Sequence, residues 1–251
     1  MKFLKHIPKR LWVILASLIT ISFLSGINFF HNYELLSYDL RFKLRPGFKA
    51  SPDIALIQIS DDTLSNLGKW PFPRDFYASL IDVLKEKGAR MVVLDLLFSE
   101  PTLDDAILAK AIKSSGNVFM AQAFEEPKRD KLFPKSDAII ADLRDTFKES
   151  CAGIGHINYA IDPDGKARRI PLFIKYNGEY YPQLALKAAC ERLKLDTRNI
   201  KRKGNKVIID NKLFLPVLSD GSFLVNYPDT WNKSFLHLSY FEVLKAYSDE
   251  K

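Results

Sequence analysis

The chain has 251 residues, of which 47% are hydrophobic and 12% aromatic, and its formal net charge is +7. This length allows one large or two small domains with a buried core, and the apolar fraction excludes an intrinsically disordered protein. Four of the basic residues precede position 30, where there is no acid, so the remainder carries 33 bases against 30 acids and shows no excess typical of nucleic-acid binding.

The N-terminus combines a basic segment with an apolar one. Residues 1–10 hold the four bases, and residues 11–30 are uncharged, which is long enough to cross a bilayer as a helix. The positive flank predicts that residues 1–10 are cytoplasmic, and that residues 31–251 lie in the periplasm or outside the cell as a single-pass inner-membrane protein. A cleaved signal peptide, with a fair site at residues 22–26, and a buried soluble helix are the alternatives.

The next segments predict alternating helices and strands. Residues 34–46 place leucines at helical spacing, and the apolar run 54–60 is typical of a buried strand. A helix over 75–88 and a strand over 90–98 complete a βαβ unit, and a helix over 102–116 with a strand over 117–124 repeats it. These units predict parallel strands.

The second half of the chain is richer in turns. Residues 125–150 predict a surface excursion with one short helix. Strands then flank the turns at 162–166 and 176–179, a helix follows over 182–193, and three strands precede a last helix capped by Ser239. The predicted fold class is α/β, a mixed sheet with βαβ crossovers flanked by helices and preceded by one transmembrane helix.

Carboxylates gather where the predicted strands end. Asp61 and Asp62 follow the first strand, and Asp95 lies in the second. Ligands bind beyond the carboxyl ends of parallel strands, so these acids could form a ligand pocket. A catalytic metal site is the weaker alternative, because the sequence has no phosphate-binding loop and no histidine beside these acids. The structural alternative is that Asp95 pairs with Arg74 inside the fold.

Other polar motifs favour structural interpretations. Residues 162–165 fail the calcium-loop pattern and predict a hairpin turn. His156 is interpreted as a packed or surface ring, and the four histidines form no metal motif, so no metal or cofactor is expected. Arg168 and Arg169 should lie on opposite faces of a strand, so at most one of them can point into a site. Residues 197–206 predict a solvated turn.

The two cysteines leave one question open. Cys151 and Cys190 could form one disulfide in an exported chain. Cys190 also lies on an apolar helix stripe, which favours a small buried thiol instead.

The stretch GKWPFPRD, residues 68–75, joins the first strand to its crossover helix. Its prolines set the entry to the helix, and Trp70 could cover the end of the sheet. The same tryptophan and Arg74, with Asp61 and Asp95, are the candidate ligand-binding residues.

Several segments occur in an order that resembles the CHASE2 family of extracytoplasmic sensory domains. They are YDLRFKLRP, DIALIQISDDTL, GKWPFPRDFYASLIDVLKEKGARMVVLDLLFSEP, DDAILAKAI and GHINYAIDPDGKARRIPL, which together span roughly residues 33–245. The family features fall on Asp39, Arg41, Asp61, Trp70, Pro71, Arg74, Gly88, Asp95, Phe98, Gly155, Asp162, Gly165 and Arg168. The resemblance gives none of them a catalytic role.

The resemblance implies a bacterial membrane-anchored sensor that perceives a small molecule or protein and takes part in transmembrane signalling. Its output partner would be an adenylate or guanylate cyclase or a kinase, and a homodimer is left open. Family members continue into further membrane helices and an output module, which this sequence lacks, so the domain over 31–251 is expected to be C-terminally incomplete. An exported metal-dependent hydrolase and a structural envelope or dimerisation module are the alternative functions.

Overall fold

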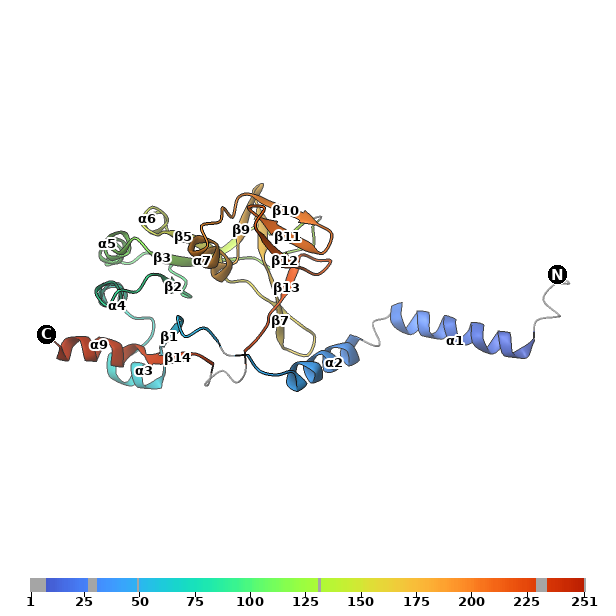
Figure 1. Ribbon diagram of the computed structural model, residues 1–251. Coiled ribbons are helices and arrows are strands. Elements are labelled where there is room, and N and C mark those ends of the chain that lie inside the picture. Colours follow the sequence, from blue (N-terminus) through green and yellow to red (C-terminus); the bar gives the residue numbers. More distant parts are fainter. Residues whose placement is uncertain (1–7, 27–30, 49, 131, 229–233, 251) are drawn as a thin grey trace. The chain divides into compact units, whose positions relative to one another are not determined.

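The computed structural model describes residues 8–26, 31–48, 50–130, 132–228 and 234–250 (Figure 1). The chain divides into two compact units. The first comprises the residues up to Phe48 together with Pro163–Gly165, and the second comprises Lys49–Asp162 together with Lys166–Lys251.

The first unit contains two helices, α1 (Lys9–Gly26) and α2 (His31–Leu44). The helix predicted over 34–46 is confirmed as α2, which ends at Leu44. Just past this end, the Arg45 guanidinium lies 3.6 Å from the Phe42 ring centroid. The predicted membrane anchor is not supported: residues 27–30 lie outside the described residues, and no helix in the described part is long and apolar enough to cross a membrane.

A four-stranded sheet forms the centre of the second unit. The strands β2 (Val92–Leu94), β3 (Val118–Phe124) and β5 (Gly153–His156) run parallel, and β4 (Ile139–Ala141) pairs antiparallel with the end of β3. The crossover helix α5 (Asp105–Ser115) joins β2 to β3, so the second predicted βαβ unit is confirmed.

Helices cover both faces of this sheet (Figure 1). Alternate residues of β3 point to opposite faces: Val118 and Met120 pack with α4 (Arg74–Glu86), α5 and α6 (Asp145–Lys148). Phe119 and Ala121 pack against α7 (Leu184–Arg192) on the other face. Burial on both faces explains why β3 is an almost continuous apolar run in the sequence.

The first predicted crossover is wrong in its pairing. The strand β1 (Ala55–Gln58) pairs in parallel with β14 (Leu236–Ser239), far along the chain, and not with β2. A helix that the sequence pattern did not predict, α3 (Asp61–Leu67), follows β1, and α9 (Tyr240–Asp249) follows β14. These two strands and two helices form a matched pair of strand-to-helix units.

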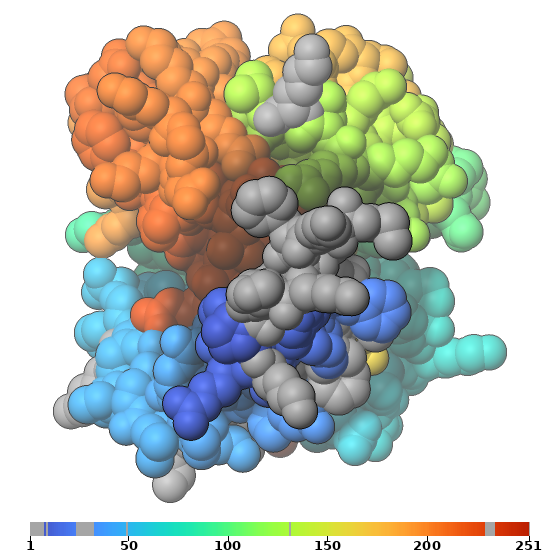
Figure 2. Space-filling view, turned by 90° about the vertical axis from the view of Figure 1, so that its right-hand side faces the viewer, coloured from blue at the N-terminus to red at the C-terminus, as the bar shows by residue number. Residues whose placement is uncertain are grey.

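Three smaller sheets complete the second unit. A sheet orders β13 (Ser222–Leu224), β7 (Ala167–Pro171) and β6 (Ala160–Ile161), and a hairpin pairs β8 (Phe173–Tyr176) with β9 (Glu179–Pro182). The third sheet orders β10 (Ile200–Lys203), β11 (Lys206–Ile209) and β12 (Leu213–Pro216), drawn in orange at the surface in Figure 2.

The turn predicted over 197–206 is wrong, because it contains β10. In this strand Ile200 and Arg202 are partly buried while Lys201 and Lys203 are exposed. The lysines on the outer face hide the period-2 pattern of the strand. The hairpin turn at Asn177 and Gly178 is confirmed, with positive φ at both residues.

Candidate functional site

The predicted strand-end carboxylates do not form one site. Asp61 begins α3 and is exposed, and Asp95 is exposed beyond the end of β2. Among the residues that the structure describes, no group of three or more His, Cys, Asp or Glu side chains could hold a metal ion. The arrangement therefore gives the metal-hydrolase interpretation no support.

Asp62 instead joins two helix starts. Its carboxylate accepts hydrogen bonds from Ser239 Oγ and Ser60 Oγ. Both bonds lower the pKa of Asp62, and the bond from Ser239 has the larger effect. Ser239 Oγ in turn accepts from the Glu242 amide at 3.3 Å, which confirms Ser239 as the N-cap of α9. The cluster ties α3 to α9.

Arg74 is buried, but its partner is not Asp95. Its Nε donates to Asp105 Oδ1 at 3.1 Å, its Nη2 donates to the Glu100 carbonyl at 3.1 Å, and its guanidinium lies 4.6 Å from the Phe98 ring centroid. Asp105 also lies 3.1 Å from Arg144 Nε. Hydrogen bonds from Thr102 and Arg74 hold the pKa of Asp105 below its usual range despite the opposing effect of burial. The predicted Arg74–Asp95 pair is therefore wrong.

Trp70 caps an aromatic cluster at the corner before α4. The Trp70–Pro71 peptide is cis, and the indole is 42% exposed. Its ring stands edge-on to Phe72 at 5.4 Å and to Tyr77 at 6.3 Å between centroids. Burial raises the pKa of Tyr77 to about 12, so its phenol stays neutral. The corner is a packed structural feature with one exposed ring edge.

A second buried ion cluster joins the ends of the β6–β7 hairpin. Asp162 is buried, and its carboxylate accepts from Arg168 Nη1 at 2.8 Å and from Arg169 Nε at 3.1 Å. The expectation that only one of the two arginines could reach a common site is wrong. Their Cβ atoms lie on opposite faces, but the long guanidinium side chains converge on the carboxylate in the turn.

The remaining family-pattern residues lie in structural positions. Asp39 and Arg41 lie in α2, Gly88 ends α4 at φ +79°, and Gly165 closes the β6–β7 turn at φ +80°. Gly155 in β5 allows α7 to approach closely, because an added Cβ would lie 2.4 Å from Leu184 Cα. Both cysteines are free thiols, so the disulfide between Cys151 and Cys190 is not formed.

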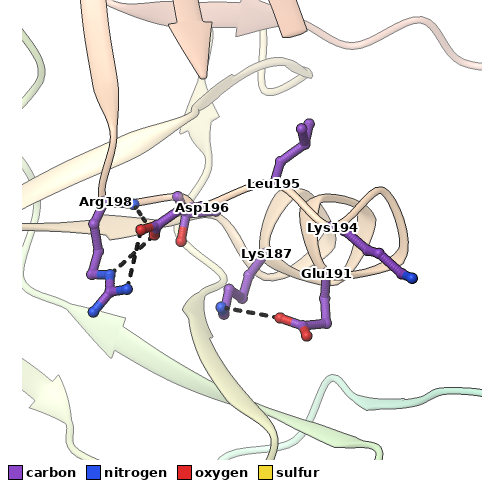
Figure 3. Close-up of a pocket in the computed structure, with 7 residues that line it drawn as sticks. Lys187, Glu191, Lys194, Leu195, Asp196 and Arg198 are labelled. Atoms are coloured by element: carbon purple, nitrogen blue, oxygen red, sulfur yellow. Dashed lines mark hydrogen bonds and ion pairs between the residues drawn. The ribbon is translucent and has the colours of Figure 1, made fainter. Parts of the chain in front are cut away.

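An open polar hollow lies beside the C-terminal half of α7 (Figure 3). Its volume is about 490 Å³, which is in the range of small-molecule sites. It is lined by Lys187, Glu191, Lys194, Leu195, Asp196, Thr197 and Arg198. The sequence pattern predicted a helix over 182–193 and a solvated turn over 197–206 here, but no ligand site.

The charges of the hollow are arranged as two ion pairs on two elements. On α7, Lys187 Nζ lies 3.6 Å from Glu191 Oε2, and on the following loop Arg198 Nε lies 3.0 Å from Asp196 Oδ1 (Figure 3). The Arg198 bonds are the main cause of a lowered Asp196 pKa. Lys187 is the best-anchored cation, because its side chain is only 23% exposed and its stem lies against Gly153 of β5.

Two buried polar side chains lie at the carboxyl end of the parallel sheet. Gln122 of β3 and His156 of β5 are register partners, and they are 2% and 0% exposed. Within the described residues, Gln122 Nε2 and both ring nitrogens of His156 have no hydrogen-bond partner. Burial lowers the pKa of His156 to about 3, so the ring is neutral near pH 7. The interpretation of His156 as a packed ring is confirmed, but its missing partners were not predictable.

Comparison with known proteins identifies one family. A family model described as CHASE2 domain matches residues 13–251. No curated protein and no solved structure matches the chain.

Proposed function

Because the chain belongs to the CHASE2 family of extracytoplasmic sensory domains, we propose that it senses a signal outside the cytoplasm and takes part in transmembrane signal transduction. The observation that carries this proposal is the family match over residues 13–251. We further propose that the chain is not itself an enzyme, and that a cyclase or kinase acts as its output partner.

The hollow beside α7 is the site that we propose for the signal. It is open to solvent, its volume suits a small molecule, and it presents both signs of charge from α7 and the loop behind it. Exposed ion pairs contribute little to folding stability, so a polar ligand could replace them at small cost.

The packing of α7 supports a route for the response. Its Lys187 stem and Leu184 lie against two glycines of β5, Gly153 and Gly155. Such close packing leaves no space for the helix to move without also displacing the strand. A ligand that draws Lys187 or Glu191 toward the loop would therefore shift α7 against the central sheet.

Ligand binding can be tested on the full chain with the low-molecular-weight fraction of a periplasmic extract. We expect this fraction to raise the melting temperature of the wild-type chain and not that of the double variant Glu191→Gln, Arg198→Gln. Lys110→Gln, an exposed change on α5, is the matched control. Equal responses in all three chains would exclude the hollow as the signal site.

The location is tested separately. Alkaline phosphatase fused after Lys251 should be active, because it requires export, and green fluorescent protein at the same position should be dark in cells that export through the general secretory route. An inactive phosphatase with a bright fluorescent fusion would overturn the extracytoplasmic placement.

A further inference from the structure

The Gln122–His156 pair differs from the other buried polar groups of the central sheet. Neighbouring groups are paired: Asn158 Nδ2 donates to the Phe124 carbonyl at 2.7 Å, Asn158 Oδ1 accepts from the Phe124 amide at 3.0 Å, and the Ile157 amide donates to the Gln122 carbonyl at 3.1 Å. By contrast, Gln122 Nε2 and both ring nitrogens of His156 lack hydrogen-bond partners within the described residues, as do Arg144 Nε and Tyr240 Oη outside the strands of this sheet. A buried polar group without a partner costs stability, and such groups require an explanation.

The two side chains lie close to one another and on one face. Gln122 and His156 are register partners in a parallel ladder, so both point to the same side of the sheet. His156 is the last residue of β5, and Gln122 lies two residues before the end of β3. Ligands of parallel sheets bind at this carboxyl edge, so the pair is where the fold most readily builds a site.

A series of aromatic rings leads from this pair toward the surface. The Phe124 ring stands edge-on to His156 at 6.4 Å, and it contacts Tyr181 at 5.1 Å and Tyr176 at 5.6 Å between centroids. Phe124 is fully buried, whereas both tyrosines are partly exposed. The Phe124 ring therefore separates the pair from the partly exposed tyrosines, and the polar atoms without partners lie at the buried end of the series.

We propose that Gln122 and His156 form the floor of a buried binding site for a small uncharged molecule that carries a hydroxyl group. A neutral imidazole offers one donor and one acceptor, and the Gln122 amide nitrogen offers donors. A hydroxyl group both donates and accepts, so it satisfies the pair. An ionised ligand would meet two neutral side chains, which cannot offset the loss of its hydration. Entry displaces the Phe124 ring toward the tyrosines.

The site is tested on the full chain by the ring nitrogens of His156, observed by ¹⁵N NMR and assigned with a His156→Leu variant. Glycerol, 1,2-propanediol and glucose are the hydroxyl-bearing probes, and 1,2-dimethoxyethane and acetate are the controls. We expect saturable shifts with at least one hydroxyl-bearing probe and none with either control. A ring that responds to no hydroxyl-bearing probe would show an ordered water only and would overturn the proposal.

A variant of matched size gives the second measurement. Gln122→Met removes the unpaired amide, so it should raise the melting temperature by about 2 to 4 °C without ligand and weaken probe binding at least tenfold. Ser136→Ala removes a buried hydroxyl that donates to the Glu125 carbonyl, and it should lower the melting temperature. A loss in Gln122→Met equal to that in Ser136→Ala would show that the amide is already paired.

This proposal does not rest on the hollow beside α7, because the two sites share no residue. Probe binding should persist in the Glu191→Gln, Arg198→Gln variant. The failure of one site therefore leaves the other proposal intact.

Discussion

The clearest consequence of the buried His156 is a loss of stability in weak acid. Folding lowers its pKa from 6.5 to about 3, so the unfolded chain binds a proton that the folded chain excludes. The stability that depends on a neutral His156 is fully present above pH 6.5, and it is lost progressively as the pH falls from 6.5 toward 3. Between pH 7.5 and 5 the loss should be about 2 kcal/mol.

The measurement is urea unfolding at a series of pH values between 7.5 and 5, for wild type and for His156→Leu. The wild type should lose about 2 kcal/mol over this interval. The variant should lose that much less, and at pH 7.5 it should be no less stable, because it removes two unpaired buried nitrogens.

The pH window and a control isolate the effect. Asp62, Asp105 and Asp220 have pKa values lowered below 3.8, so the stability they contribute is lost below the window. Phe119→Leu, on the opposite face of the same sheet, should lower stability equally at every pH. Parallel curves for wild type and His156→Leu would refute the reasoning.

Three further predictions concern other parts of the fold. Gly155→Ala should cost about 1 to 3 kcal/mol of unfolding free energy, because the added Cβ would lie 2.4 Å from Leu184 Cα. The control Gly204→Ala, at φ +59° in open space, should cost about 1 kcal/mol or less in the same denaturation assay. Equal costs for the two variants would contradict the close approach of α7 to β5. Asp105→Asn should cost about 3 to 5 kcal/mol of unfolding free energy by leaving Arg74 without its charged partner. The double variant Arg74→Met, Asp105→Leu should recover most of that loss, and an Asp105→Asn variant as stable as wild type would contradict the pairing. Thiol titration should find two thiols in the unreduced, denatured chain and slow reaction when it is folded, since burial raises the pKa of both Cys151 and Cys190; fewer than two would indicate a disulfide.

The parts of the fold that the sequence predicted are those set by local pattern. The crossover from β2 through α5 to β3, the Asn177-Gly178 hairpin and the Ser239 cap each depend on spacing within a few residues. The pairing of β1 with β14 depends instead on segments far apart in the chain. Both strands are short, and nothing in either run specifies its neighbour.

The candidate sites escaped prediction for a different reason. Polar residues in an apolar strand usually mark its solvent face, so Gln122 gave no sign of full burial, and for His156 the sequence did not decide between a packed and a surface ring. Asp105 was likewise hidden in the first turn of α5, where an acid is expected for helix-dipole reasons alone. In each case burial by distant segments, and not the residue's own neighbours in sequence, decides its role.

The helix α7 connects the two proposed ligand sites, and this makes their interaction measurable. Its C-terminal half lines the hollow, while Leu184 at its N-terminal end lies against Gly155, the residue before His156. If a ligand in the hollow shifts α7, the geometry at His156 changes, and the two sites are coupled. Thermodynamic linkage then requires that a hydroxyl-bearing probe at His156 alters affinity in the hollow by the same factor as the reverse. Titrating each site with the other saturated tests this reciprocity. Two affinities that are each unchanged by the other ligand would show that α7 does not transmit the signal, even if both sites bind.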